Sequence, residues 1–309
     1  MNHTGVHDFV LAVDFGGTKI AIATADLAGH VLEQSRLETR ALDGAEQILT
    51  RTLAEARVLI ARTEAQSKGQ CVSIGIASPG IVRDDGIALS PNIPGWEHVR
   101  LRFTMRTALG VATIVAANDV KAAALAEVRW GALQNANPAV FLSLGTGIAS
   151  ALIVDGRVLT GAHGASGEIG YNLRGVSDIY GAAHGRAPLE EVVGGRFIGE
   201  RGSKLLGEQL SAAELFSHAD VRVHSFVEET LTELATHVAN LAILIDPARI
   251  AIGGGLMNSS SLILDAISSR LAYAVPFPPE LVPAHFLSDS SLYGAIALAL
   301  TEWVDGKWK

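Results

Sequence analysis

The sequence predicts an α/β protein of two domains with a cleft between them. One observation is a strand, a glycine turn and a second strand near the N-terminus, at residues 9–32. Another is a second hairpin of the same kind at residues 139–159, which indicates a duplicated domain. The third is the length of 309 residues, which is enough for two domains of ordinary size.

The first hairpin carries the most specific motif of the chain. An apolar run ends at Asp14, and the turn that follows contains Gly16, Gly17, Thr18 and Lys19. Glycines without a Cβ let the backbone bend sharply and let a ligand approach closely. The N–H groups of such a turn, with the threonine hydroxyl, are suited to bind phosphate oxygens. Asp14 can hold a Mg²⁺-bound water beside them, although a plain hairpin turn is an alternative interpretation.

The second hairpin repeats the pattern with a glycine–threonine turn. This turn consists of Gly145, Thr146 and Gly147. Two such turns, facing each other across a cleft, would bind both ends of a triphosphate. A third glycine turn follows a short apolar strand and precedes a helix, where a nucleotide base and ribose can lie close to the backbone. Its residues are Gly253, Gly254 and Gly255.

Hydrophobic spacing assigns the next elements in chain order. Residues 43–69 place apolar side chains on one helical face, with Gly69 as a stop. Alternation from Cys71 to Ala77 predicts a strand, and the sequence Ser78-Pro79-Gly80 then opens a loop that runs to Leu101. An ordered loop of this length is typical of a functional segment.

The rest of the chain alternates helices with short strands, as expected for α/β domains. Further helices are predicted at residues 103–109, 120–133, 189–206, 212–219, 223–244, from about 259, and at 292–303. Further strands are predicted at residues 113–116, 249–252 and 281–287. The glycine-dense stretch 161–170 and the stretch 171–188 are expected to be irregular.

Asn118 and Asp119 stand where a short buried strand meets a helix. An aspartate at a helix start is commonly an N-cap, and this is one interpretation of Asp119. The other is catalysis, because phosphoryl transfer to a hydroxyl needs a base that orients the attacking oxygen. A carboxylate of ordinary pKa can serve, since the proton can leave late, as the P–O bond forms. Asn118 offers both a donor and an acceptor to neighbouring hydroxyl groups.

Composition limits the class of protein. Hydrophobic residues make up 49% and charged residues 18%, as in an ordinary globular protein with a core. The formal net charge of −8 and the lack of a Lys/Arg-rich run argue against nucleic-acid binding. No apolar stretch reaches the roughly 20 residues of a membrane span, and the N-terminal residues do not form a secretory signal. We therefore expect a cytoplasmic protein in which the single cysteine, Cys71, is a core residue.

These motifs resemble those of the sugar-kinase and actin superfamily, and more narrowly those of the ROK family (repressors, open reading frames and sugar kinases). The resemblance runs from about Val10 to about Leu298, with the motifs in the family's order. It implies two ribonuclease-H-like (actin-like ATPase) domains, and an interdomain cleft that closes around the sugar. It also implies that ATP and Mg²⁺ are the cofactors and that Asp119 is the catalytic base.

The resemblance also assigns residues that bind the sugar. Glu168 matches a family glutamate that contacts sugar hydroxyls, and Glu190 matches a second one. Carboxylates suit this task because they can accept two hydroxyl protons. A second interpretation of Glu190 is an acidic residue at a helix N-terminus, which the helix dipole favours. In the long proline-rich loop, Gly80 and Asn92 match positions that line the family's sugar pocket.

The sequence departs from the family after Gly170. Tyr171 stands where the family has a histidine, and residues 172–188 lack the cysteines of the family's zinc motif. We therefore expect no zinc site, since His163 and His184 alone would make a poor one. Tyr171 can still form a hydrogen bond with the sugar, but its bulk is expected to reject an N-acetyl substituent.

The resulting prediction is a glucokinase-like enzyme that phosphorylates the primary hydroxyl of a hexose-like sugar. An amino sugar (kanosamine-like) or a C7-cyclitol of a specialised pathway is an alternative acceptor, and polyphosphate is an alternative donor. A non-catalytic sugar sensor, which would lack the base or a phosphate turn, is the alternative of another class. We place the small domain at residues 1–117, completed by the C-terminal helix 292–309, and the large domain at 118–291. We expect a homodimer without nucleic-acid or membrane partners.

Overall fold

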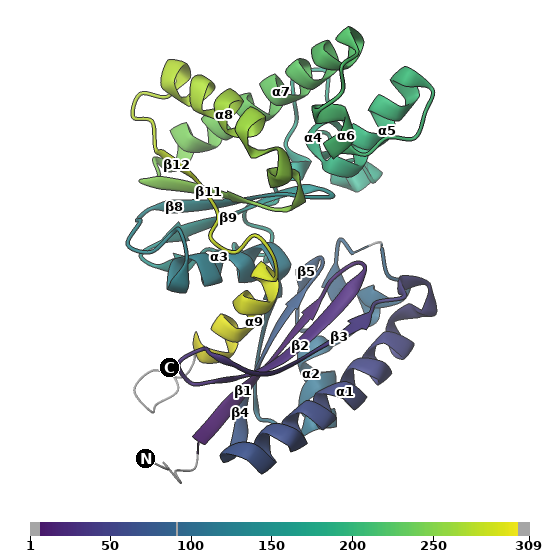
Figure 1. Cartoon of the computed structure of the whole chain (residues 1–309), viewed down its shortest axis with the longest axis vertical. Helices are drawn as coiled ribbons and strands as arrows, with labels where there is room; N and C mark the ends of the chain where they lie inside the picture. The colour runs from purple at the N-terminus through teal and green to yellow at the C-terminus, as the bar shows by residue number, and fades with distance from the viewer. Residues whose placement is uncertain (1–6, 91, 302–309) are drawn as a thin grey trace. The chain divides into compact units, whose positions relative to one another are not determined.

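The computed structural model describes residues 7–90 and 92–301 of the chain (Figure 1). The chain divides into two compact units, each with its own hydrophobic core. The first unit runs to Ala126 and resumes at Asp289, and the second is Glu127–Ser288. The first boundary thus falls inside the helix that follows Asn118, whereas we predict it directly before that helix.

The first unit is built on a five-stranded sheet with the strand order β3-β2-β1-β4-β7. Its strands are β1 (His7–Phe15), β2 (Lys19–Asp26), β3 (Val31–Glu38), β4 (Lys68–Ser78) and β7 (Thr113–Asn118). Tight turns join β1, β2 and β3, so these strands are antiparallel, whereas β1, β4 and β7 run parallel. Partly buried and exposed residues alternate along β3, as expected for an edge strand with one covered face.

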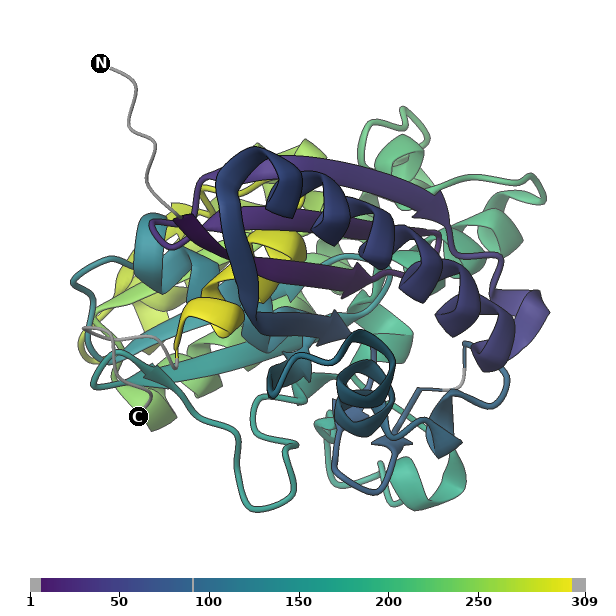
Figure 2. The same ribbon diagram turned by 90° about the horizontal axis from the view of Figure 1, so that it is seen from below.

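Helices cover both faces of this sheet (Figure 2). α1 (Gly44–Ser67) packs on the face to which Ile74 and Ile76 of β4 belong. α9 (Ser290–Thr301) packs on the opposite face, at Gly75 between these two isoleucines. A Cβ at Gly75 would overlap with the backbone of α9, so the glycine permits a close approach of helix and sheet. α9 is therefore part of the first unit although it comes last in the described chain.

The segment between β4 and α2 (Leu101–Leu109) is anchored by one aromatic side chain. Trp96 is fully buried, with its ring edge-on to Phe15 at 5.0 Å between centroids. Its Nε1–H donates to Ser78 Oγ at 3.0 Å. The segment also contains the paired strands β5 (Ile81–Val82) and β6 (Ile87–Ala88). The long loop is thus a packed part of the first unit.

The second unit has a five-stranded sheet of the same topology, with the order β10-β9-β8-β11-β12. Its strands are β8 (Ala139–Leu144), β9 (Ile148–Val154), β10 (Arg157–Val158), β11 (Arg249–Gly253) and β12 (Glu280–Pro283). Three antiparallel strands again come first, and β8, β11 and β12 run parallel. Two sheets with one topology agree with the duplication that the two hairpins predict.

Helices α7 (Val221–Ile245) and α8 (Ser260–Ala274) pack against each other in the second unit. They supply buried apolar side chains to the same core cluster as β8 and β11. α7 is apolar along one side because Val223, Val227, Leu234 and Val238 recur at helical spacing. The shorter helix α6 (Ala212–Phe216) begins with a capping box between Ser211 and Glu214.

One predicted helix is in fact two. We predict a single helix at residues 189–206, but the structure has α4 (Glu190–Val193) and α5 (Gly195–Leu206). Gly194 between them has extended backbone, with φ −69° and ψ 137°, and its N–H donates to the Glu190 carbonyl at 2.8 Å. This break lets the N-terminus of α5 reach the β8–β9 turn.

A predicted strand also ends earlier than expected. β12 ends at Pro283, whereas we predict a strand up to residue 287. α9 ends at Thr301, and the predicted end of this helix at residue 303 lies outside the described residues.

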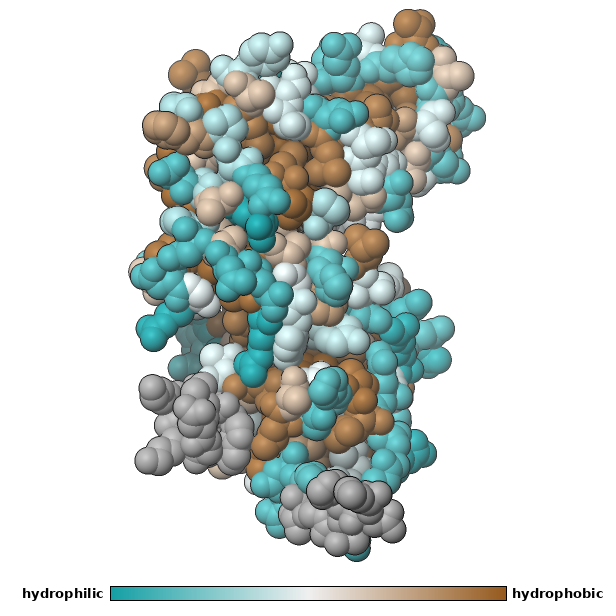
Figure 3. Space-filling model, turned by 60° about the vertical axis from the view of Figure 1, so that its left-hand side comes forward, coloured by the Kyte–Doolittle hydropathy of each residue, from teal (hydrophilic) through white to brown (hydrophobic). Residues whose placement is uncertain are grey.

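Polar side chains cover much of the face drawn in Figure 3, with apolar ones between them. Among the described residues, none of the helices combines the length and the hydropathy needed to cross a membrane.

Candidate active site

Three parallel strands of the first unit end at one edge of its sheet. Asp14 of β1 pairs with Ala77 of β4, and Ala77 pairs with Ala117 of β7. Because parallel strands present their carboxyl ends at the same edge, Asp14 lies there with the last residue of β7 and the residue after it. These residues are Asn118 and Asp119. The charge of Asp119 is one of the causes that raise the pKa of Asp14, which agrees with this proximity.

Asn118 and Asp119 have different tasks at the start of α3 (Asp119–Trp130). Asn118 Oδ1 accepts the backbone N–H of Lys121 at 2.8 Å, the hydrogen bond expected of an N-cap side chain. Asp119 Oδ1 accepts the N–H of Val120 at 2.9 Å. Burial raises the pKa of Asp119, while hydrogen bonds from the backbone of Val120 and of Asp119 itself, and the charge of Lys121, oppose the shift. The capping task that the sequence left open for Asp119 thus belongs to Asn118.

The carboxylate of Asp14 is a candidate ligand for a cation. Its Oδ1 atom is buried and has no hydrogen-bond partner among the described residues. Burial first, and then the charges of Asp119 and Asp289, raise the pKa of Asp14 to about 7. A cation near this oxygen would favour the ionised form. The side chain therefore fits the Mg²⁺-binding task that we predict for it.

A threonine from the end of β3 holds the β1–β2 turn. Gly16 N–H donates to the Lys19 carbonyl at 3.0 Å across the turn. Thr39 Oγ1 donates to the Gly16 carbonyl at 2.6 Å, and Thr39 N–H donates to the Thr18 carbonyl at 2.9 Å. A Cβ on Gly17 would meet no atom within 4 Å, so the turn is open at this residue. Sequence reasoning missed Thr39, because nothing in its local pattern marks it.

Gly80 and Asn92, which we predict to line the sugar pocket, lie in the segment after β4. Gly80 has φ +78°, and a Cβ there would lie 2.6 Å from the Ala88 carbonyl oxygen. The fold of the β5–β6 hairpin thus already requires a glycine at this position. Asn92 is exposed in the turn before the buried Ile93. A contact of either residue with a sugar stays a prediction.

The second unit repeats the arrangement with the β8–β9 turn. Gly145 N–H donates to the Gly147 carbonyl at 3.0 Å and closes this turn. The N-terminus of α5 lies directly on it, because Gly195 N–H donates to the Gly145 carbonyl at 2.9 Å and Arg196 N–H to the Thr146 carbonyl at 3.0 Å. The helix break at Gly194 is what brings α5 to the turn.

The glycine turn after β11 adjoins the β8–β9 turn. Gly253 ends β11, and Gly254 has φ +97°, where a Cβ would overlap with the Leu144 carbonyl. A Cβ on Gly145 would meet only the Gly255 nitrogen, at 4.0 Å, and one on Gly255 would meet no atom within 4 Å. The predicted phosphate turn and the predicted nucleoside turn of this unit are therefore neighbours.

Glu190 connects the β8–β9 turn to the segment with Glu168 and Tyr171. Its Oε2 accepts the Ile148 N–H at 3.1 Å, and the same carboxylate fills the space that a Cβ on Gly147 would need. Burial first, and then the charges of Glu168 and Glu190, raise the pKa of the Tyr171 hydroxyl. The structure thus brings together the three predicted sugar-binding residues of the second unit, beside its predicted phosphate turn.

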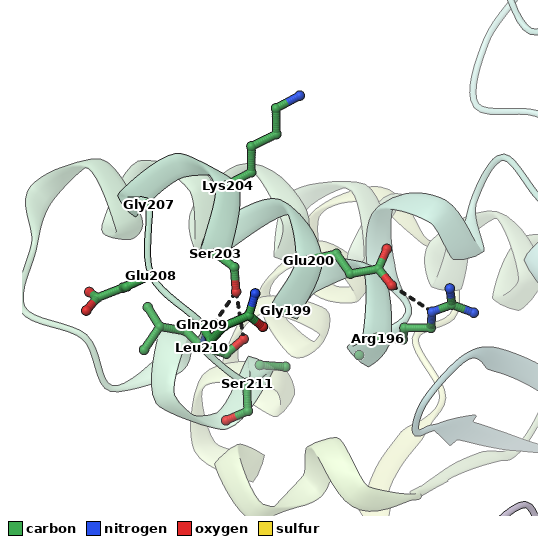
Figure 4. Close-up of a pocket in the computed structure, with 12 residues that line it drawn as sticks. Arg196, Gly199, Glu200, Ser203, Lys204, Gly207, Glu208, Gln209, Leu210 and Ser211 are labelled. Carbon is green, nitrogen blue, oxygen red and sulfur yellow. Dashed lines mark hydrogen bonds and ion pairs between the residues drawn. The ribbon is translucent and has the colours of Figure 1, made fainter.

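A groove of about 600 Å³ lies along α5 (Figure 4). One face of α5 and the segment 207–212 line it, and it begins at Arg196, next to the β8–β9 turn. Arg196 Nε donates to Glu200 Oε1 at 2.7 Å, and Ser203 Oγ accepts the Leu210 N–H at 2.8 Å. Sequence reasoning missed this groove, because one face of a helix becomes a groove only when a distant segment folds beside it.

Two α/β units of one topology, each with a glycine turn after its first strand, define the two-domain actin-like ATPase fold. The chain belongs to the ROK family, whose profile matches residues 10–302. It is 31% identical over 303 residues to an N-acetylmannosamine kinase of Escherichia coli, covering 94% of this chain and 98% of that protein. It is 28% identical over 293 residues to a glucokinase of Halalkalibacterium halodurans, covering 86% of each chain.

A solved structure extends the likeness to three dimensions. It is a ROK family glucokinase from Streptomyces griseus in complex with glucose and AMPPNP, with a TM-score of 0.75 and 25% identity. The match covers 95% of this chain and 99% of that chain. The predicted family, fold class and kinase activity are confirmed by these matches. The chain is a carbohydrate kinase that uses ATP.

Proposed function

We propose that the chain transfers the γ-phosphoryl group of ATP to the primary hydroxyl of a hexose-like sugar, with glucose or a close relative as the preferred acceptor. The observation that carries this proposal is the pair of carboxylates, Asp14 and Asp119, at one edge of the first sheet. One is suited to a cation and the other to a hydroxyl proton. Phosphoryl transfer to an alcohol needs both.

Asp119 is proposed as the general base. Asn118 already caps α3, so helix capping does not account for a carboxylate at position 119. Burial raises the pKa of Asp119, and a carboxylate with a raised pKa accepts a proton more readily. In this role Asp119 orients the acceptor oxygen and takes its proton, so that the O–H bond breaks as the new P–O bond forms.

Mg²⁺ is proposed as the cofactor beside Asp14. The buried Asp14 Oδ1, which has no hydrogen-bond partner among the described residues, supports a role as acceptor for a Mg²⁺-bound water. When bound, Mg²⁺ neutralises charge on the phosphates of the donor. The backbone N–H groups of Gly17 and Thr18 would donate to phosphate oxygens, with the ammonium of Lys19 at the end of the turn.

The β8–β9 turn and the α5 groove are proposed to bind the donor. The turn of Gly145, Thr146 and Gly147 would hold phosphates, and the groove that begins there has a volume typical of small-molecule sites. We therefore assign the ribose and base to the groove and to the neighbouring turn Gly253–Gly255. An inorganic polyphosphate would use the turn without the groove, so the groove favours ATP as the donor.

The sugar ring is proposed to bind at Glu168, Tyr171 and Glu190 of the second unit. Carboxylates accept hydroxyl protons well, and two of them flank the phenol of Tyr171. The bulk of this phenol favours glucose over a sugar with an N-acetyl group. The similarity to an N-acetylmannosamine kinase makes N-acetylmannosamine the second candidate. An amino sugar of the kanosamine type is a further candidate, since its ammonium would pair with either glutamate. A C7-cyclitol is another, since its hydroxyl groups would donate to the same carboxylates.

A coupled ADP-release assay over a panel of acceptors tests the proposal. The panel holds glucose, mannose, N-acetylmannosamine, 3-amino-3-deoxyglucose and a C7-cyclitol, each with ATP and Mg²⁺. We expect turnover with glucose or a close relative, and none with 6-deoxyglucose, which is the matched control without the primary hydroxyl. Turnover of 6-deoxyglucose would contradict the assigned hydroxyl. Silence across the panel, with ATP binding intact, would overturn the proposed acceptors.

A further inference from the structure

Helix α7 carries a stripe of side chains that faces the segment with the predicted sugar-binding residues. The stripe consists of Phe226, Glu229, Glu233 and His237, which are three or four residues apart and so lie on one side of the helix. Side chains from residues 172–201 meet this stripe at both of its ends. All of these residues belong to the second unit.

Asn172 and Arg174 contact the C-terminal half of the stripe. Arg174 Nε donates to Glu233 Oε1 at 2.9 Å, and Asn172 Nδ2 lies 3.5 Å from His237 Nδ1. His237, which is 8% exposed, has its Nε2 atom 3.5 Å from the same Glu233 oxygen. An amide that donates to Nδ1 leaves the imidazole proton on Nε2. One chain of polar contacts therefore runs from Asn172 through His237 and Glu233 to Arg174.

Arg201 contacts the N-terminal half of the stripe. Its guanidinium carbon lies 4.8 Å from the centroid of the Phe226 ring, and its Nη1 donates to the Val192 carbonyl at 2.9 Å. Burial lowers the pKa of Arg201, the charge of Arg174 lowers it further, and Glu229 opposes the shift. These contacts fix α5 and the residues just before it against α7.

The segment that α7 holds has little regular structure of its own. Residues 172–188 contain a single short 3-10 helix, Ala182–His184, and expose the apolar side chains of Leu173, Val176 and Ile179. The segment nevertheless follows Tyr171 directly, and Asn172 N–H donates to the Ile169 carbonyl at 2.9 Å. The contacts with α7 are thus one to three residues from Tyr171.

We propose that Glu233, with Arg174 and His237, is a positioning residue for the acceptor sugar, an inference that rests on the sugar-kinase function proposed above. Glu233 acts through the two side chains that it binds, and these fix the backbone next to Tyr171 and Glu168. A carboxylate suits this position because its Oε1 atom accepts the Arg174 Nε–H and lies 3.5 Å from His237 Nε2. Hydrogen bonds to an ionised acceptor are the stronger ones. Through these contacts Glu233 affects the affinity for the acceptor.

Steady-state kinetics of Glu233→Gln and Arg174→Met, alone and combined, test this proposal. In each single variant we expect the KM for the acceptor to rise about tenfold, within the range of coupling between contacting residues, while kcat and the KM for ATP change by less than about twofold. The acceptor KM of the double variant should be no higher than that of the more impaired single variant, because both changes break the same chain of contacts. Glu280→Gln, which removes a partner of Arg249 in another ion pair of the same unit, is the matched control and should change neither KM.

Hydrogen exchange of the ligand-free protein adds a readout that does not depend on turnover. In Glu233→Gln we expect faster backbone exchange at residues 168–188 and unchanged exchange at residues 139–147. Equal rises of both KM values, an unchanged acceptor KM, or additive effects in the double variant would overturn the positioning role. If the wild type turns over no sugar of the panel, the proposed acceptor assignment fails and the positioning role fails with it, even if exchange at residues 168–188 is faster in the variant.

Discussion

At the first turn of α3, two neighbouring side chains divide tasks that a sequence pattern cannot separate. Asn118 caps the helix, and Asp119 keeps a carboxylate of raised pKa close to Asp14. In Asp119→Asn the amide is nearly isosteric, so we expect the fold and the KM for the sugar to be retained. We expect kcat to fall by about 10²–10⁴, as for a removed general base. This corresponds to about 3–5 kcal/mol of transition-state stabilisation at roughly 1.36 kcal/mol per decade.

The matched variant for Asp119→Asn is Asn118→Ala. It removes the cap and should lower the free energy of unfolding by about 1 kcal/mol, whereas Asp119→Asn should not lower it. Urea titration measures the stability of both variants, and the ADP-release assay measures kcat of Asp119→Asn. If Asp119→Asn kept kcat within a small factor of wild type, Asp119 would not be the base.

We expect a substitution at Gly17 to affect ligand binding and not the stability of the fold. A Cβ there would meet no protein atom within 4 Å, so Gly17→Ala should leave the melting temperature unchanged. The added methyl group would instead occupy the space in which phosphate oxygens approach the turn. Losing one charge-assisted hydrogen bond costs about 1.5–3 kcal/mol, so we expect the KM for ATP to rise at least about tenfold. Isothermal titration measures the Kd for AMPPNP, which should rise by a similar factor. Gly181→Ala, a change at an equally open glycine, is the control.

At the scale of elements, the close contact of α9 with β4 closes the core of the first unit. Gly75 lies against the backbone of Ala295, and a Cβ there would overlap with it. Overpacking of this kind typically costs about 1–3 kcal/mol. Gly75→Ala should therefore lower the melting temperature by several degrees, in contrast to Gly17→Ala. Calorimetry of the two variants compares the same added methyl group at a packed position and at an open one. If Gly75→Ala melted at the same temperature as Gly17→Ala, α9 would not pack on β4 as described.

At the scale of the whole molecule, the buried carboxylates make stability depend on pH. The pKa of Asp14 rises from 3.8 to about 7 on folding, and that of Asp119 is also raised. A carboxyl group with a raised folded-state pKa contributes stability that is fully present below its unfolded pKa and is lost as pH rises through the folded pKa. Without Mg²⁺, this contribution should therefore fall between about pH 4 and pH 7.

Asp14→Asn isolates this effect, because the amide does not titrate. We expect the variant to be more stable than the wild type at pH 8 in EDTA, with a difference that shrinks toward pH 5. Thermal melting of both proteins across this pH range measures the difference. A difference that stayed constant with pH would show that ionisation of Asp14 does not oppose folding.

Local sequence patterns were enough to predict most of the secondary structure of this protein. Strands, helices and glycine turns follow from apolar spacing and from residues without a Cβ, which act within a few residues. The first hairpin, the β8–β9 hairpin, α1 and α7 were predicted close to their observed bounds. The order of these motifs was enough to indicate the ROK family, the actin-like fold and the kinase activity, which the comparisons confirm.

Only the tertiary structure decided what depends on residues far apart in the chain. The break at Gly194, the hold of Thr39 on the β1–β2 turn, and the α5 groove all arise where distant backbone groups meet. The raised pKa of Asp14 likewise needs burial and the charges of Asp119 and Asp289, which β-strand pairing and the return of the chain bring close. Spacing along a sequence reports which face a side chain occupies, but hydrogen bonds and desolvation depend on which atoms of other segments lie against that face.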